Sequence, residues 1–96
     1  MDASEGVTAA IIACNAVESD NQDRQLNANY QRYLAGMSTD VKQNFIRAQR
    51  LWVKFRDENC GAFTFQEAGG SLAAIVGSGC YLKMTAERAD DFDRHP

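Results

Sequence analysis

Apolar residues recur at helical intervals along most of this 96-residue chain. Between Val7 and Met37 they return every three or four positions, and the polar stretch from Glu18 to Gln25 contains no glycine or proline that would interrupt a helix. We therefore predict one helix from about Val7 to Met37, with a break inside the polar stretch as the alternative. Gly36 lies where such a helix is expected to end.

The next segment has the clearest amphipathic pattern in the chain. Ser38 or Thr39 can cap a helix, because their hydroxyls accept hydrogen bonds from the first free backbone N–H groups. Apolar residues then follow at intervals that keep them on one helical face: Val41, Phe45, Ala48, Trp52 and Phe55. We predict a second helix that ends near Cys60 and buries this stripe, so Trp52 is expected in the core rather than at a binding surface.

Residues 61–71, GAFTFQEAGGS, are the least regular stretch. Phe63 and Phe65 alternate with small or polar residues, but a single strand would have no partner, so we predict a packed loop. The Gly69-Gly70 pair permits a tight turn, and Ser71 can cap the helix that follows.

A third helix is predicted from Leu72 to about Asp91. Gly77 and Gly79 lie in its middle, and a glycine costs a helix interior about 1 kcal/mol relative to alanine. We therefore expect a kink or a break at these glycines. Together the segments predict a single all-α domain over residues 1–96, a small bundle of three to four helices.

Composition and net charge argue against some classes of function. The chain is 45% apolar and has no apolar run long enough to span a bilayer. Its net charge of −3 argues against a nucleic-acid binder, which needs a basic surface, and favours basic protein partners.

The three cysteines bear on both stability and compartment. Two helices joined at the Gly-Gly turn can fold back antiparallel and bring Cys60 close enough to Cys80 for a disulfide. Such a bridge would stabilise the domain by about 3 kcal/mol in the chain-entropy view. Three free buried thiols are the alternative. Cys14 would then be a buried thiol, or would pair with a cysteine upstream of Met1.

Enzyme chemistry has little support in this sequence. Three scattered cysteines and one histidine, with no CxxC pair, do not make a zinc site. No phosphate-binding glycine loop or nucleophile–base pair is present, and His95 lies near the C-terminus. We expect no catalytic residue, no metal and no cofactor. A small hydrolase is the weakest of three functional hypotheses and would need a pocket with two close carboxylates.

Several runs of the chain nevertheless resemble one family. The runs CNAVESDNQDRQLNANYQRYL, AQRLWVKFRDENC, EAGGS and CYLKMTAER look like the lysozyme-inhibitor LprI-like family of small bacterial envelope proteins, over about residues 14–92. The matching residues are Cys14, Asp23, Leu26, Asn27, Tyr30, Gln49, Arg50, Trp52, Arg56, Asp57, Cys60, Gly69, Gly70, Ser71, Cys80, Thr85 and Arg88.

The resemblance implies a helical fold, export behind a signal peptide and typically four cysteines in two disulfides. This chain has three cysteines. No signal peptide follows Met1, so the protein is either cytosolic or a mature chain whose leader has been removed. With the resemblance and the cysteines, we expect the second alternative, a periplasmic or secreted chain. The implied function is inhibition of lysozyme by blocking its active-site cleft. The alternative is a structural or interaction module of the cell envelope, whose oligomeric state the sequence does not give.

Most of the matching residues are expected to be structural. Arg56 and Asp57 can tie helix ends together, with Arg50 as another partner for Asp57. Asn27 and Tyr30, one turn apart, can form a buried polar contact, and Thr85 and Arg88 can act similarly. The candidate binding loop is different, because Cys60 and Cys80 would hold it rigid. Its residues are Phe63, Phe65, Glu67, Gly69, Gly70 and Ser71.

Overall fold

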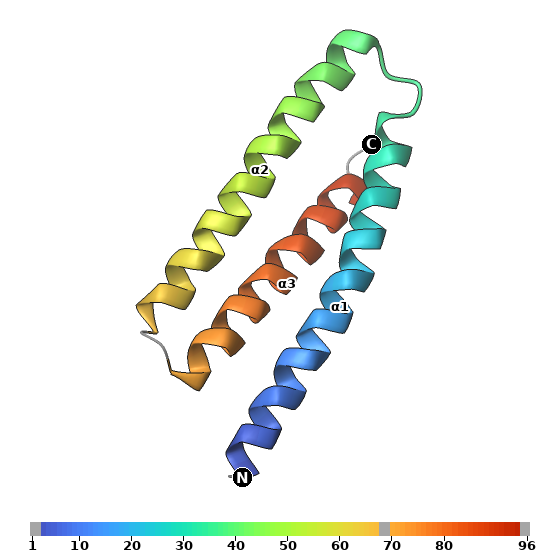
Figure 1. The fold of residues 1–96 in the computed structure, drawn as a ribbon. Coiled ribbons are helices and arrows are strands. Elements are labelled where there is room, and N and C mark those ends of the chain that lie inside the picture. The colour runs from blue at the N-terminus through green and yellow to red at the C-terminus, as the bar shows by residue number, and fades with distance from the viewer. Residues whose placement is uncertain (1–2, 68–69, 95–96) are drawn as a thin grey trace.

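Three long helices form the protein. The computed structural model describes residues 3–67 and 70–94, and its helices are α1 (Ala3–Leu34), α2 (Thr39–Gln66) and α3 (Ser71–Arg94). The chain runs up α1, down α2 and up α3, so α1 and α3 are parallel and α2 is antiparallel to both (Figure 1). The described part contains no strand, and the predicted all-α, disulfide-linked bundle is confirmed.

The predicted signals account for the turn between α1 and α2. The first helix is continuous through its polar middle, as predicted, and ends at Leu34 rather than Met37. Gly36 has φ +83°, a left-handed conformation that suits glycine after a helix end. Ser38 is the N-cap of α2, and its Oγ accepts a hydrogen bond from the backbone N–H of Val41 at 3.3 Å.

Two predictions about the later chain are wrong. Residues 61–66 continue α2 instead of forming a loop. The only strong helix-weakening residue there is Gly61, whose cost of about 1 kcal/mol is small beside the packing of a 28-residue helix. In addition, α3 runs through Gly77 and Gly79 without a break. Gly77 is required by contact: a Cβ there would collide with Oγ1 of Thr64 on α2.

The core is small and lies where α1 and α3 pack together. Leu26, Ala89 and Phe92 are buried, and partly buried aromatic rings surround them: Tyr30, Tyr33, Phe45 and Trp52. Phe92 stands edge-on to Tyr30, with ring centroids 5.2 Å apart. The molecule is correspondingly long and thin, about 56 × 22 × 15 Å.

The second helix is less covered than its pattern predicts. Both α1 and α2 pack on α3, whereas they barely contact each other. Trp52 and Phe45 are therefore partly buried, but Phe55 stays 60% exposed and Val41 39% exposed. The prediction that the whole stripe is buried is thus wrong at Val41, Ala48 and Phe55, because no helix lies against that side of α2 among the described residues.

Candidate functional site

A buried arginine joins all three helices at the middle of the bundle. Arg56 of α2 is only 7% exposed. Its Nε lies 3.0 Å from Oδ1 of Asp57, and its Nη1 lies 3.8 Å from Oδ1 of Asp23 on α1. Nη1 also donates to Oγ1 of Thr85 on α3, which is fully buried. The charge of Arg56 is therefore balanced by two carboxylates, as a buried cation requires.

Aromatic rings complete the surroundings of Arg56. Its guanidinium carbon lies 4.0 Å from the ring centre of Tyr81 and 5.0 Å from that of Trp52, which is cation–π geometry. The Tyr81 hydroxyl donates to Oδ2 of Asp23 at 3.2 Å. Burial raises the pKa of Tyr81, and the nearby Asp23 adds to this rise while Arg56 opposes it.

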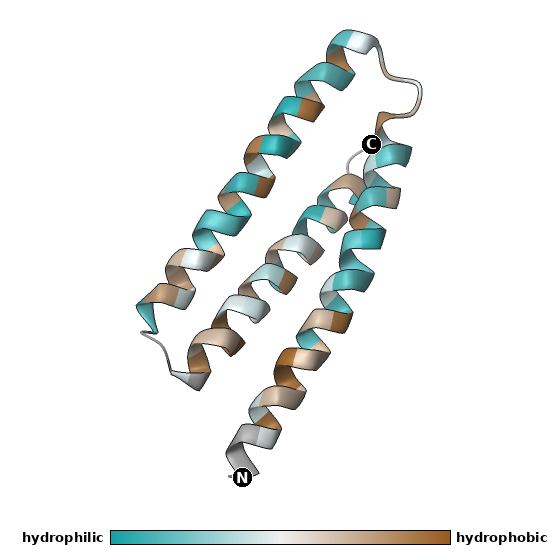
Figure 2. Cartoon of the chain, in the orientation of Figure 1, coloured by the Kyte–Doolittle hydropathy of each residue, from teal (hydrophilic) through white to brown (hydrophobic). Residues whose placement is uncertain are grey.

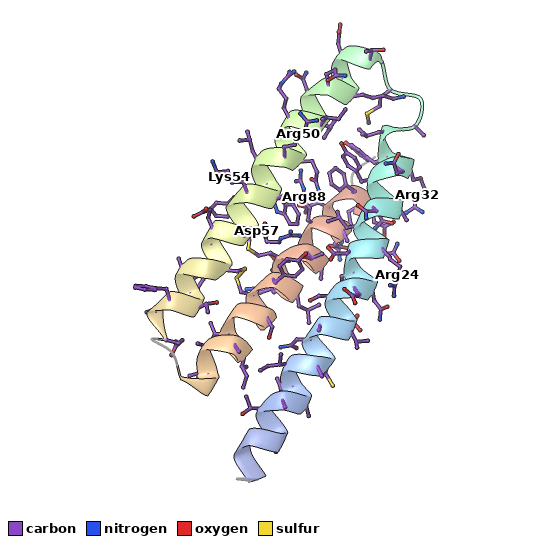
Figure 3. The ribbon with its side chains drawn as sticks, in the orientation of Figure 1. Arg24, Arg32, Arg50, Lys54, Asp57 and Arg88 are labelled. Carbon is purple, nitrogen blue, oxygen red and sulfur yellow. A yellow bond between two sulfur atoms is a disulfide. The ribbon has the colours of Figure 1, made fainter. Side chains whose placement is uncertain are left out.

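A second arginine, Arg88 of α3, also joins two helices and contacts aromatic rings. Arg88 Nε donates to Oε1 of Gln49 at 3.0 Å, so it links α3 to α2. Its guanidinium lies 4.6 Å from the ring centre of Phe92 and 5.7 Å from that of Trp52. Burial lowers the pKa of Arg88, opposed by Asp91 at 3.8 Å. Figure 3 shows Arg88 between α2 and α3, whereas Lys54 projects from the outer side of α2.

The structure thus brings together most of the residues that carry the sequence resemblance. Their polar groups form hydrogen bonds and ion pairs with one another. Every fully buried side-chain nitrogen and oxygen of the described residues has a hydrogen-bond partner. This arrangement leaves no buried donor free for a ligand, so the geometry fits a role in holding the helices together. Leu26 also belongs here, as a core residue that is 4% exposed.

Two of the predicted polar residues lie elsewhere. Asn27 is exposed, so the proposed buried contact with Tyr30 is wrong. Its neighbour Asn29 is the buried one, and its Nδ2 donates to the backbone carbonyl of Ala89 at 2.8 Å. Arg50 is exposed and makes no ion pair within the described part of the chain.

Sequence reasoning missed Tyr81 and Asn29. Tyr81 could have been found, because it follows Cys80 directly and lies one helical turn before Thr85, which places it on the same face. No signal separates Asn29 from Asn27, since both are asparagines in a polar stretch and only the position of α3 decides which is covered.

The end of the bundle where α2 ends and α3 begins is held by a disulfide bond and by a close packing contact. Cys60 and Cys80 form the predicted disulfide, with their Cα atoms 5.5 Å apart. One turn further along α2, Thr64 packs against Gly77 and its Oγ1 donates to the carbonyl of Cys60 at 2.8 Å. Cys14 of α1 is a free and exposed thiol, so of the two alternatives given for it the buried thiol is wrong.

This same end exposes large apolar side chains. We call it the disulfide end and define it by Phe63, Phe65, Glu67 and Leu72. Phe65 is 87% exposed, Leu72 52% and Phe63 47%. Figure 2 shows apolar colouring where α2 and α3 join and along the first turns of α1, whereas the upper part of α2 is largely polar.

The predicted binding loop is corrected by these positions. Phe63 and Phe65 lie on the last turns of α2, Glu67 is the C-cap of that helix, and Gly70 lies in the turn. Gly69 and the side chain of Ser71 lie outside the described residues.

A groove runs beside the disulfide end, between α2 and α3. Its volume is about 490 Å³, and its lining includes Phe63, Met84 and the disulfide-bonded Cys80. Lys83 and Glu87 stand at this groove and form an ion pair of 3.9 Å. The groove is therefore mostly apolar with a charged rim. Residues 3–67 and 70–94 contain no cluster of metal-ligating side chains, and none of their helices is long and apolar enough to cross a bilayer.

Comparison with known proteins identifies the family. The family described as lysozyme inhibitor LprI matches residues 1–92, so the chain belongs to this family. An uncharacterized protein of Rhizobium meliloti (strain 1021) is 32% identical over 79 residues, an alignment that covers 69% of this chain. The chain spans 57% of the length of that relative. No solved structure matches the chain.

Proposed function

We propose that this member of the LprI family inhibits a lysozyme by inserting its disulfide end into the substrate cleft of the enzyme. The observation that carries the proposal is the exposure of Phe65, 87% of whose surface is open to solvent at a position fixed by the Cys60–Cys80 bridge. Such exposed apolar side chains indicate a binding surface rather than a folding need.

The shape and chemistry of this end suit a cleft. It lies at one end of a molecule whose extents are about 56 × 22 × 15 Å, the same end as the N-terminus of α1 (Figure 1). Lysozyme keeps one catalytic carboxyl protonated in an apolar pocket beside a tryptophan ring, and a phenyl ring can pack there. Because the disulfide and the Thr64–Gly77 contact already order this end, little conformational entropy is lost when it binds.

Charge supports the same partner. The chain carries a net charge of −3, which favours approach to a basic muramidase. Glu67 is the C-cap of α2 and adds an acidic residue to the disulfide end, two positions after Phe65. We infer that the protein acts outside the cytoplasm, where its target is found and where a disulfide persists.

A cell-wall turbidity assay tests the proposal. Micromolar protein should slow the clearing of a bacterial cell-wall suspension by a basic lysozyme, and Phe65→Ala should weaken this inhibition at least tenfold, by analogy with other buried interface anchors. Val17→Ala is the control, because Val17 is an exposed apolar residue of α1 (63%) outside the disulfide end.

Two results would contradict the proposal. Absence of inhibition at high micromolar concentrations of folded, disulfide-bonded protein would remove the function. Equal inhibition by Phe65→Ala and by the parent protein would keep the function but remove the disulfide end as its site.

An envelope interaction module is the second candidate function. One observation favours it: exposed apolar residues also occur on α2 well away from the disulfide end, at Leu51 (69%) and Phe55 (60%). A protein that only inserted its tip into a cleft would have no need of this second apolar surface.

A further inference from the structure

The second apolar surface lies on α2 and has a heptad pattern. We call it the outer α2 face: Val41, Ala48, Leu51 and Phe55. Positions 41, 48 and 55 are seven residues apart, and Leu51 lies between the last two, so the four side chains fall on one side of the helix. Leu51 and Phe55 are 69% and 60% exposed, Val41 is 39% exposed, and Ala48 is also exposed.

Charged side chains border this face and lack partners within the molecule. Arg47, Lys54 and Glu58 are all exposed. Within residues 3–67 and 70–94 none of the three forms an ion pair, and Arg47 only donates a hydrogen bond to Asn44. An apolar strip edged by such charges is the pattern of helices that pair with another helix.

We propose that the outer α2 face pairs with the same face of a second copy of this chain, with the two α2 helices antiparallel. A two-fold axis crossing α2 between residues 52 and 53 places Arg47 of each copy level with Glu58 of the other. The contact is therefore self-complementary, as a two-fold dimer requires. Ala48, Leu51 and Phe55 of both copies lie between the two ion pairs, and Val41 lies outside them.

The charge distribution along α2 selects this direction. The segment from Thr39 to Lys54 contains four basic residues and one acidic residue, whereas one basic residue, the buried Arg56, and three acidic residues follow: Asp57, Glu58 and Glu67. Antiparallel helices bring the basic half of one copy beside the acidic half of the other. Parallel helices would place Lys54 beside Lys54 and Glu58 beside Glu58, which is repulsive.

The same charges argue against lysozyme as the occupant of this face. A basic muramidase would be repelled by Arg47, Arg50 and Lys54, whereas a second copy offers its own Glu58. The proposed dimer is argued from the outer α2 face alone, so it does not depend on the proposed inhibitory function.

Sedimentation velocity in a Cys14→Ser background tests the dimer, since this change prevents disulfide exchange at the exposed thiol. The protein should be dimeric at tens of micromolar, and Leu51→Glu should raise the dissociation constant at least tenfold. Val17→Glu, at an equally exposed valine of α1, should leave it unchanged. A monomer at 200 μM, or a dimer that Leu51→Glu does not weaken, would overturn the proposal.

A charge exchange tests the antiparallel pairing. Glu58→Arg alone should weaken the dimer, because it places a positive charge level with Arg47 of the partner copy. The double change Arg47→Glu with Glu58→Arg should restore most of the loss, since each copy again offers opposite charges. A double variant as weak as the single one would overturn the antiparallel register, and circular dichroism at each step shows that the helices are intact.

Discussion

The middle of the bundle and its disulfide end use opposite kinds of residue for opposite tasks. In the middle, Arg56 is 7% exposed and is surrounded by carboxylates, a hydroxyl and aromatic rings from three helices. At the disulfide end, Phe65 is 87% exposed. Charged and polar groups thus join the helices at the middle, whereas apolar side chains are exposed at the end proposed for binding. The polar residues most noticeable in the sequence lie in the structural cluster rather than at the proposed binding surface.

The largest expected effect on stability follows from removal of the disulfide bond. Replacing Cys60 and Cys80 together by alanine should lower the free energy of unfolding by about 3 kcal/mol, because the bridge closes a loop of 20 residues. Urea denaturation followed by circular dichroism measures this. The inhibition should fall as well, since the end is no longer ordered before binding. Unchanged inhibition by the folded double variant would show that preorganisation is irrelevant.

The next largest effect on stability follows from removal of the buried arginine at the middle of the bundle. Arg56→Ala should cost about 2–3 kcal/mol, because it removes a well-packed buried side chain and leaves Asp23, Asp57 and Thr85 without their shared partner. Arg50→Ala on the same helix is the matched control, and since Arg50 is exposed it should change the stability by less than about 0.5 kcal/mol. A similar loss of stability for both variants would contradict the structural role assigned to the buried Arg56.

Substitutions at two glycines of α3, Gly77 and Gly79, test the packing near the disulfide. Gly77→Ala should destabilise the protein by about 1 kcal/mol, because its Cβ would collide with Thr64 and this outweighs the better helix propensity of alanine. Gly79→Ala should instead stabilise it by up to about 1 kcal/mol, because its nearest neighbour, Asn15 Nδ2, lies 4.0 Å away. In a Thr64→Ala background Gly77→Ala should become stabilising, and a persistent loss there would contradict the collision.

The smallest effect concerns Tyr81 and depends on pH. Tyr81→Phe removes the hydrogen bond to Asp23 and should cost about 1 kcal/mol at neutral pH. The fold raises the pKa of Tyr81 and so favours its protonated form. The resulting stabilisation is complete below its unfolded pKa of about 10 and is lost as pH rises beyond it. Unfolding curves from pH 8 to 11 should therefore show a steeper decline for the parent than for Tyr81→Phe.

Local patterns in the sequence were sufficient for the first turn and the disulfide, but not for the packing around the helices. The helix cap at Ser38, the turn glycine at position 36 and the Cys60–Cys80 bridge follow from residue type and spacing. Which side of α2 is covered does not, because Val41, Phe45, Trp52 and Phe55 form one apolar stripe whichever neighbour is present. Only the position of α3 decides that Trp52 packs inward while Phe55 faces solvent.

The loop prediction for residues 61–66 failed for a similar reason. Phe63 and Phe65 lie among small and polar residues, so periodicity gives no helical signal there. The helix continues because Thr64 hydrogen-bonds to Cys60 and packs against Gly77, a contact made across the bundle. Asn29 was missed because the carbonyl of Ala89 that it binds is on another helix, whereas Tyr81 had a local signal in its spacing from Cys80 and Thr85.

The order of the helices along the chain has a consequence for how the protein comes to be folded. The first helix packs chiefly on the third and barely on the second, so its main partner is the helix most distant from it along the chain. The Arg56 cluster likewise needs Tyr81 and Thr85. A nascent chain that ends before α3 therefore has no core around which to collapse. Folding of this domain must therefore wait until α3 is present, because its closing contact joins the helices most distant along the chain.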